Sequence, residues 1–233
     1  MVNRPFTPIG ALVHDAPDFS LIDLLPAKVD SVLDIGCGTG RLGARIRELS
    51  SECRIVGVTL SPEEAAAARS RLNEVHVRDL RVESFADLGR FQVVVCSHSL
   101  GYFHDVERFL SSVRTVLLPE GRLLLAVPNV LAWRTRLQFL LGRFQYVQSG
   151  ALHHGYARFY DRRSIAAMLD INGFEILRRR DQGSFPQPFW RRRLTKFANA
   201  VDRAFVAALP GLFAHEFLIE ARVKDATRDK GFH

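Results

Sequence analysis

The sequence has few cysteines, few lysines and no long uninterrupted apolar stretch. Its three cysteines, Cys37, Cys53 and Cys96, lie far apart without a C-x-x-C pair, which excludes a disulfide framework and a structural zinc site. The longest apolar stretch, residues 115–131, is interrupted by prolines and charges, whereas a membrane span needs roughly 18 consecutive apolar residues. The first residues lack the apolar core of a signal peptide. These absences predict a cytoplasmic protein with no transmembrane segment and no metal site.

Glycine and proline, at 16 and 10 residues, are too scarce for a collagen or low-complexity chain. With 47% hydrophobic and 24% charged residues, the chain is too apolar to be disordered and can bury a full core. Arginine is abundant, since lysine supplies only four of the 32 basic residues. The net charge of +7 is uneven, because residues 130–196 carry +9 and the remainder −2. This excess fits solvated faces, an anionic substrate, a nucleic acid or an acidic membrane surface.

Between residues 30 and 129, short β-branched runs alternate with segments of helical periodicity. We expect strands at 31–35, 54–60, 75–80, 91–97 and 121–128. Helices are expected at 40–50 and 62–73, and a third one begins after Asp105. This alternation predicts an α/β fold with a mostly parallel sheet and helices on both faces.

After residue 129 the pattern changes, and residues 130–160 show no clear strand. A helix is expected at 162–171, with strands at 174–180 and 216–223. An amphipathic helix lies within 186–210, and its apolar residues Trp190 to Phe205 either pack on the core or lie on a membrane interface. We expect one domain over residues 1–233 with a core at 30–129, and with insertions at 130–160 and 184–213 that cap the substrate.

The strongest local signal is the run Val32-Leu-Asp-Ile-Gly-Cys-Gly-Thr-Gly40. Glycines allow a sharp turn and a close approach to a ligand, and the following helix N-terminus attracts an anion such as a carboxylate. Residues 38–43 also satisfy the dinucleotide pattern G-x-G-x-x-G, but Thr59 stands where an acid should hold the ribose. A dinucleotide site is therefore the weaker interpretation.

The same run resembles the signature of class I S-adenosylmethionine-dependent methyltransferases, over about residues 31–129. The resemblance implies a Rossmann-like fold with a seven-stranded sheet and an inserted cap, and S-adenosylmethionine as the cofactor. It places Asp34 at the amino end of the cofactor and Gly36 and Gly38 behind its methionine part, and it includes Cys37 and Gly40 of the same loop in the cofactor site. It further implies that Asp79 and Leu80 contact adenine and that Ser97 lies beside the methyl donor.

One position departs from this signature. The second strand of the family normally ends in an acid that binds both ribose hydroxyls, and here Thr59 and Leu60 occupy that place. The segment Gly57-Val-Thr-Leu-Ser61 is similar to cyclopropane-fatty-acid synthases, which also use this cofactor and tolerate threonine there. Cofactor binding is still expected, but the ribose contact is left open.

The acceptor is expected to be a small molecule. The fourth strand leads into Cys96-Ser-His-Ser-Leu-Gly-Tyr102, without the Pro-Pro-Tyr of enzymes that methylate adenine or glutamine, and no ribonucleoprotein motif is present. Residues 150–160, Gly-Ala-Leu-His-His-Gly-Tyr-Ala-Arg-Phe-Tyr, resemble the cap motif of ubiquinone-type small-molecule methyltransferases. In that motif Arg158 matches, whereas the family's Asp and His fall on His153 and Tyr156. We therefore expect Tyr102, Tyr156 and Arg158 to contact the acceptor.

Three histidines are candidates for a general base, because the imidazole pKa lies near neutral pH. They are His98, beside the expected donor, and His153 and His154 in the cap. We predict methyl transfer to a hydroxyl oxygen of a sugar, polyketide-like or quinone-like acceptor, which the basic cap suggests to be anionic or lipid-linked. A homodimer is compatible with this prediction. The open alternatives are a non-catalytic accessory protein, a fatty-acyl-modifying enzyme of the cyclopropane-synthase type and an RNA methyltransferase, although nucleic acid is the less favoured substrate.

Overall fold

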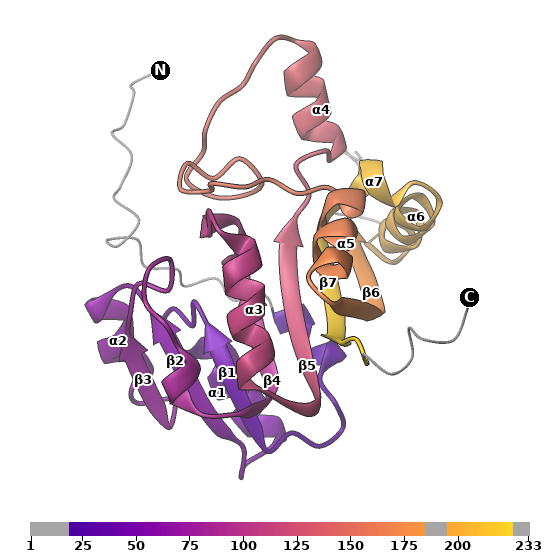
Figure 1. Ribbon diagram of the computed structural model, residues 1–233. Coiled ribbons are helices and arrows are strands. Elements are labelled where there is room, and N and C mark those ends of the chain that lie inside the picture. Colours follow the sequence, from indigo (N-terminus) through magenta and orange to yellow (C-terminus); the bar gives the residue numbers. More distant parts are fainter. Residues whose placement is uncertain (1–18, 185–194, 226–233) are drawn as a thin grey trace, which may run out of the picture.

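A seven-stranded sheet forms the centre of the protein (Figure 1). The computed structural model describes residues 19–184 and 195–225. The strands are β1 (Ser31–Ile35), β2 (Arg54–Thr59), β3 (Glu74–Val77), β4 (Phe91–Ser97), β5 (Leu117–Pro128), β6 (Phe174–Gly183) and β7 (Ala214–Val223). The helices are α1 (Arg41–Leu49), α2 (Pro62–Ala68), α3 (Val106–Val116), α4 (Trp133–Leu140), α5 (Arg162–Ile171), α6 (Thr195–Ala208) and α7 (Pro210–Phe213).

The strand order is β3-β2-β1-β4-β5-β7-β6, and only β7 runs antiparallel to its neighbours. The chain runs from β1 through β2 to β3 on one side and then crosses to β4 on the other side of β1. This reversal creates the topological switch point where open α/β sheets bind ligands. Ile35 of β1 lies beside Val58 of β2 and Cys96 of β4, so these strands end at the same level. The predicted α/β, Rossmann-like class of fold is confirmed.

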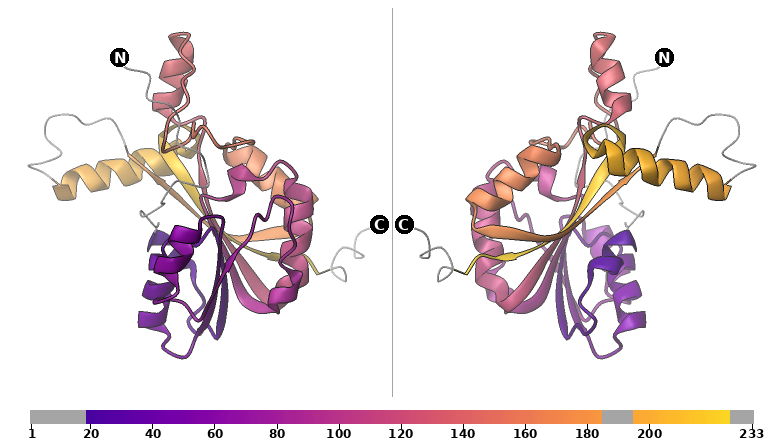
Figure 2. Two further views of the ribbon diagram at one scale, coloured as in Figure 1. Left: turned by 90° about the vertical axis from the view of Figure 1, so that its left-hand side faces the viewer. Right: turned by 90° about the vertical axis from the view of Figure 1, so that its right-hand side faces the viewer.

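Two apolar layers cover the sheet, one on each face (Figure 2). One layer holds α1, α2 and the 3-10 turn Phe19–Leu24, and the other holds α3 and α5. Val93 and Val95 face the first layer, whereas Val94 between them faces the second. A central parallel strand is apolar on both sides for this reason, and the sequence pattern identified it correctly.

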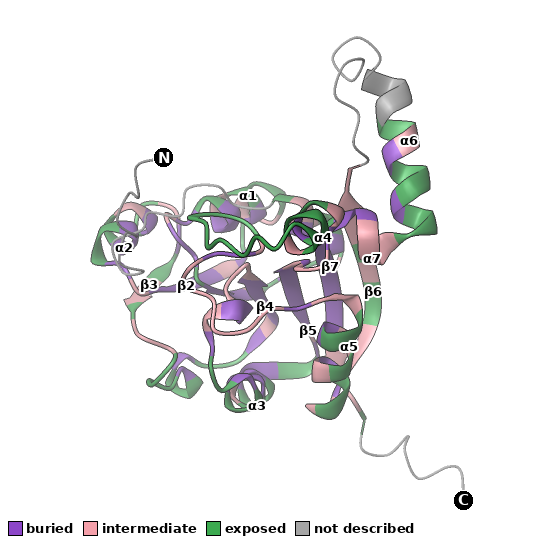
Figure 3. Ribbon diagram, turned by 90° about the horizontal axis from the view of Figure 1, so that it is seen from above, coloured by how far each residue is buried: buried purple, intermediate pink, exposed green. Residues whose placement is uncertain are grey.

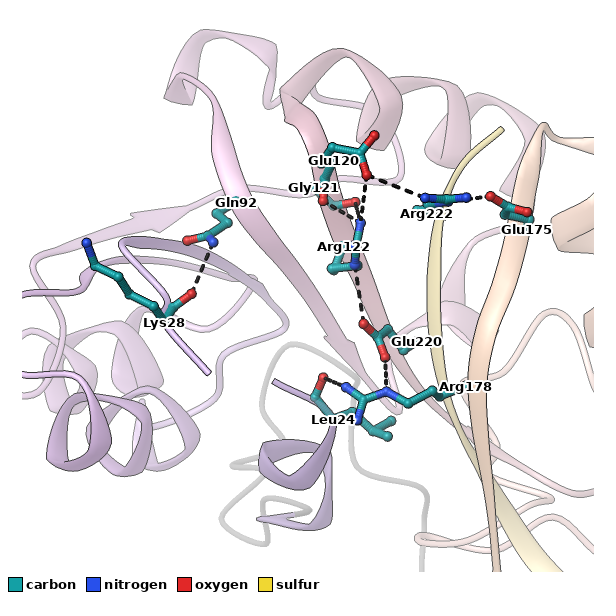
Figure 4. Close-up of polar contacts among 10 residues, drawn as sticks. All are labelled: Leu24, Lys28, Gln92, Glu120, Gly121, Arg122, Glu175, Arg178, Glu220 and Arg222. Atoms are coloured by element: carbon teal, nitrogen blue, oxygen red, sulfur yellow. Dashed lines mark hydrogen bonds and ion pairs between the residues drawn. The ribbon is translucent and has the colours of Figure 1, made fainter. Parts of the chain in front are cut away.

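A buried carboxylate joins the antiparallel part of the sheet to the rest (Figure 4). Glu220 of β7 pairs with Arg122 of β5, at 3.3 Å, and with Arg178 of β6. The Arg178 guanidinium also donates to the carbonyl oxygen of Leu24, at 2.9 Å. Because a buried charge is tolerated only when it is paired, this network stabilises the order β5-β7-β6.

Several boundaries differ from the sequence prediction. Strand β3 ends at Val77, so Asp79 and Leu80 lie in the loop after it rather than in the strand. Strand β5 starts at Leu117, earlier than expected. Helix α4 was not predicted at all, because its leucines are largely exposed and give no stripe that packs on a core.

The two expected cap insertions lie in different places. Residues 130–160 leave the sheet after β5 and return beside it, where the backbone nitrogen of Val130 donates to the carbonyl oxygen of Tyr160 at 2.9 Å. Helices α6 and α7 instead pack beside β6, and α6 extends away from the body (Figure 3). The Trp190 end of the expected amphipathic helix lies outside the described residues. No helix within residues 19–184 and 195–225 has both the length and the hydrophobicity needed to cross a bilayer.

Candidate active site

A cleft of about 620 Å³ opens at the carboxyl ends of the parallel strands, at the switch point of the sheet. Most of the residues predicted to hold the cofactor line it, and the cap closes one side with residues 148–151. The predicted lining residues are Asp34, Gly36, Cys37, Gly38, Thr59, Leu60, Asp79, Leu80, Ser97, His98, Tyr102, His153 and Tyr156. Strand ends that share one level bring these side chains together although the sequence separates them.

The glycine loop has a backbone that only glycine adopts without strain. Gly36, Gly38 and Gly40 have φ angles of 77°, 52° and 78°. A Cβ atom on Gly36 would lie 3.0 Å from the Cβ of Ser99. Ser99, which sequence reasoning missed, fixes this contact by donating its hydroxyl to the carbonyl oxygen of Ile35 at 2.8 Å. The loop is therefore held against the end of β4, and its open side faces the cleft.

Asp34 is the most unusual group in the cleft. Its side chain is 1% exposed, and its Oδ2 atom has no hydrogen-bond partner in the described part of the chain. Burial raises the pKa of this carboxyl to about 7. A buried carboxylate without a partner is costly, and a cationic ligand group in the cleft would relieve that cost. The site thus fits the ammonium group of S-adenosylmethionine.

A second carboxylate reaches the end of β2 from the following helix. Glu64 of α2 is buried, and it accepts a hydrogen bond from the hydroxyl of Thr59. Ser61 caps α2 by accepting from the backbone nitrogen of Glu64 at 3.2 Å. This hydrogen bond fixes the position of the Glu64 backbone, from which the carboxylate extends. Sequence reasoning found Thr59 in place of the family's acid but missed Glu64. The pattern Ser61-Pro-Glu-Glu64, a capping-box spacing, is the signal that could have found it.

The loop after β3 presents Asp79 to the cleft in a paired state. Its two oxygens accept from Arg81 at 2.8 and 2.6 Å. The Arg81 guanidinium holds the pKa of this carboxyl below its usual range. Asp79 therefore stays ionised at neutral pH, and Arg81 lines the same side of the cleft.

His98 lies at the opposite end of the cleft, directly after β4, and has a φ angle of 54°, which is rare outside glycine. Its Nε2 atom is 3.2 Å from Oε2 of Glu216, and His215 Nε2 is 3.3 Å from Oε1. Burial raises the pKa of Glu216, but hydrogen bonds from His215 and His98 outweigh this effect and lower it to about 2. Sequence reasoning missed Glu216 because it lies on β7, near the other end of the chain.

Aromatic side chains from two segments line the cleft beside His98. The rings of Tyr102 and Tyr156 meet edge to face at 4.9 Å, and the ring of His153 lies 5.5 Å from that of Tyr102. Tyr156 donates its hydroxyl to the carbonyl oxygen of His98, at 3.1 Å. His153 accepts from the backbone nitrogen of Gly155 at 3.0 Å, so its Nδ1 atom orders the cap.

Three predicted site residues do not line this cleft. Gly40 lies behind the loop, where a Cβ atom would approach Ala68 at 3.1 Å. His154 stacks on His153, with 4.5 Å between the ring centroids. Arg158 donates to the carbonyl oxygen of His104 at 2.8 Å and pairs with Glu107 at 3.2 Å. These contacts hold the cap to the start of α3.

Comparisons with known proteins agree with this geometry. The methyltransferase domain family matches residues 12–179. A ubiquinone biosynthesis O-methyltransferase of Xanthomonas axonopodis pv. citri (strain 306) is 30% identical over 200 residues, which cover 81% of this chain and 79% of that protein. The enzyme of that name from Xanthomonas euvesicatoria pv. vesicatoria (strain 85-10) is 30% identical over 173 residues, covering 70% and 68%.

Solved structures show the same fold. A SAM-dependent methyltransferase from Archaeoglobus fulgidus superimposes with a TM-score of 0.61 at 13% identity, covering 87% of this chain and 90% of that one. An S-adenosylmethionine-dependent methyltransferase from Mesorhizobium loti gives 0.58 at 18% identity, with coverages of 87% and 95%.

Proposed function

The chain belongs to the methyltransferase domain family, and from that premise we propose that it methylates a hydroxyl oxygen of a small aromatic acceptor. The predictions of a small-molecule methyltransferase and of S-adenosylmethionine as its cofactor are confirmed. When bound, this cofactor supplies a methyl group activated by the sulfonium. The observation that carries the proposal is the pairing of His98 with the buried carboxylate of Glu216, beside an aromatic wall.

The cofactor half of the cleft supports the following assignment. Asp34 takes the ammonium group, since Oδ2 has no partner among the described residues. The glycine loop backs the methionine part, because Gly36 and Gly38 line the cleft with a backbone that only glycine adopts without strain. Glu64 and Thr59 together hold the ribose hydroxyls, and so replace the single acid of the family. Asp79 and Leu80 face the adenine.

His98 acts as the general base in this proposal. Its Nε2 faces Glu216, so Nδ1 is the ring nitrogen that accepts the proton of an acceptor hydroxyl in this proposal. The carboxylate stabilises the imidazolium that forms, because the low pKa of Glu216 keeps it ionised. His153 and His154 organise the cap rather than take this proton, since the Nδ1 atom of His153 is occupied by Gly155.

The acceptor is assigned from the walls beside His98. Tyr102 and Tyr156 offer edge-to-face contacts that suit an aromatic ring. A phenolic hydroxyl is also more acidic than an alcohol, so an imidazole base suffices for it. The relatives that carry the name of ubiquinone biosynthesis support a quinone-like acceptor over a sugar.

A transfer assay with methyl-labelled S-adenosylmethionine tests the proposal. The acceptors are a dihydroxybenzoate, the same ring with a prenyl tail, a hexose, unsaturated phospholipid vesicles and bulk RNA. We expect label in the phenolic compounds alone. Label in the acyl chains or in RNA would instead show one of the alternative activities, and cofactor binding without any transfer would show an accessory protein.

A further inference from the structure

The end of helix α4 exposes a concentration of apolar side chains. Leu140 is 84% exposed, Leu141 62% and Phe144 55%. We call residues 137–147 the α4 tip, and its exposed apolar members are Leu137, Leu140, Leu141, Phe144, Tyr146 and Val147. Every residue from 140 to 150 is exposed, and the tip projects away from the body in Figures 1 and 2. Soluble surfaces rarely concentrate apolar side chains in this way without a binding role.

The tip is ordered rather than a loose strand of apolar residues. The ring of Phe144 stacks on that of Phe139 at 5.7 Å and meets Tyr146 edge to face at 5.2 Å. Helix α4 stops at Leu140, and Gly142 turns the chain back with a φ angle of 66°. The aromatic rings therefore stay together at the end of the projection.

The charge around the tip has one sign. Residues 130–160 contain Arg134, Arg136, Arg143 and Arg158 and no acidic residue. Arg158 is paired with Glu107 at the base of the cap. Arg136 donates to the carbonyl oxygens of Leu131 and Gly211. Arg134 lies on α4 and Arg143 directly after it. Apolar and aromatic side chains with flanking arginines are the composition of segments that lie in an anionic membrane interface.

We propose that the α4 tip docks into the headgroup region of a membrane that contains anionic lipids. A membrane suits the tip better than a protein does, because α4 forms a narrow projection and not a groove or a flat face (Figure 2). The arginines complement lipid phosphates, while the leucines and aromatic rings enter the acyl boundary. The contact is peripheral, since α4 is only eight residues long.

Docking at this point has a consequence for the cleft. Gln148, Ser149, Gly150 and Ala151 follow the tip directly and line the cleft. A docked tip therefore holds the acceptor side of the cleft next to the membrane surface, where an acceptor with a lipid tail resides. This inference goes beyond the proposed function, because it concerns where the enzyme works and not which bond it forms.

Co-sedimentation of the full chain with vesicles tests the docking. The vesicles contain phosphatidylcholine alone or with one third phosphatidylglycerol. We expect binding to the mixed vesicles only, weakened by added salt. Leu140→Gln with Leu141→Gln should lower the vesicle affinity at least tenfold. The matched control is Leu49→Gln with Ile171→Gln, because these residues are 58% and 81% exposed outside the tip.

Charge is tested by a second pair of variants. Arg134→Gln with Arg143→Gln should lower the affinity for the mixed vesicles by about fivefold per arginine. Arg69→Gln with Arg90→Gln removes the same charge elsewhere on the surface, and we expect it to bind nearly as the parent chain does. Both pairs should methylate a soluble acceptor at the parental rate, so a failure of docking is distinguishable from a failure of the proposed activity.

Three results would overturn the proposal. One is equal vesicle binding by the parent chain and the leucine variants. Another is binding that ignores the anionic lipid. The third is a parent chain that ignores vesicles and sediments as a dimer, with the leucine variants monomeric, because the tip would then be an interface between two copies.

Discussion

The cofactor half and the cap of this protein are built on opposite principles. In the cofactor half, polar side chains such as those of Asp34 and Thr59 are buried at the ends of strands. The hydrogen bonds of the sheet leave these strands little freedom to move. In the cap, residues 140–150 are exposed, and the fold holds them through a few contacts such as Asn129 to Tyr160. A ligand common to a whole family suits the rigid half, whereas an acceptor that varies suits the half with few constraints.

The same contrast applies to charge. The excess of arginine in residues 130–196 was expected to serve acceptor recognition, but several of these arginines have structural partners. Arg162 and Arg179 pair with Asp181, Arg178 pairs with Glu220, and Arg180 pairs with Asp23. Arg134 and Arg143 near α4 have no acidic partner among the described residues, and we assign them to the proposed membrane contact and not to the acceptor. The functional part of the charge is therefore smaller and more localised than composition suggests.

The largest effect on catalysis is expected from a substitution of His98. This residue follows β4, and its carbonyl oxygen accepts from Tyr156 of the cap. Replacing it with asparagine, which tolerates the left-handed backbone, should lower kcat about 100-fold or more and leave the affinity for S-adenosylhomocysteine unchanged. Steady-state kinetics and calorimetry measure the two quantities. His104→Asn, an exposed position, is the control. An unchanged kcat would mean that the acceptor reacts through proximity alone, or with Tyr102 or Tyr156 as its partner.

The rigidity of the cofactor half is tested at Gly36. Gly36→Ala should lower the affinity for S-adenosylhomocysteine roughly 100-fold, because the new Cβ strains the backbone and meets Ser99 at 3.0 Å. Gly142→Ala, in the cap, has a similar φ angle but nothing within 4 Å, and we expect it to bind normally. Titration calorimetry compares the two, and equal affinities would contradict the assignment of the loop.

The proposed contact of Asp34 with the ammonium group makes cofactor binding depend on pH. Asp34→Asn should weaken cofactor binding about 30-fold, since the buried partner of the ammonium is lost. The unliganded variant should nevertheless be more stable at pH 8. An acid whose pKa is raised from 3.8 to about 7 on folding loses stability as the pH rises between these values. Thermal unfolding at pH 5 and pH 8 measures this, and we expect the variant to gain more in Tm at pH 8 than at pH 5, because the penalty is only partly present at pH 5.

A smaller effect is expected from the carboxylate that replaces the family's acid. Glu64→Gln should weaken S-adenosylhomocysteine binding about tenfold, because the hydrogen bond donated to a charged acceptor is lost. Glu63→Gln is a matched control, because Glu63 is exposed on the same turn of α2. Equal affinity for S-adenosylhomocysteine and its 2′,3′-dideoxy analogue in the parent chain would show that neither Thr59 nor Glu64 holds the ribose hydroxyls.

The smallest effect is expected at Arg158 in the cap. The ion pair with Glu107 is about half exposed and bonds of this kind contribute roughly 0–1 kcal/mol. Arg158→Gln should therefore lower Tm by a few degrees at most and change kcat/KM less than threefold. A large rise in the acceptor KM alone would instead place Arg158 in contact with the acceptor, as the cap motif implied.

Sequence reasoning succeeded wherever a residue is tied to a strand end. Asp34, Ser97 and the glycines up to Gly38 could be placed because local patterns locate the ends of β1 and β4. It failed for groups that arrive from another element. Glu64 reaches Thr59 from α2, and its signal was the start of that helix rather than the strand. Glu216 reaches His98 from β7, and no spacing near His98 reveals it.

The sequence by itself determined the α/β class, the glycine loop and the family, because apolar periodicity and turn chemistry are local properties. Only the tertiary structure decided which charges work together. It paired His98 with Glu216, used Arg178 to neutralise Glu220, and left the α4 tip exposed. The physical reason is that electrostatic and apolar contacts depend on distance in space, which strand order and helix packing set.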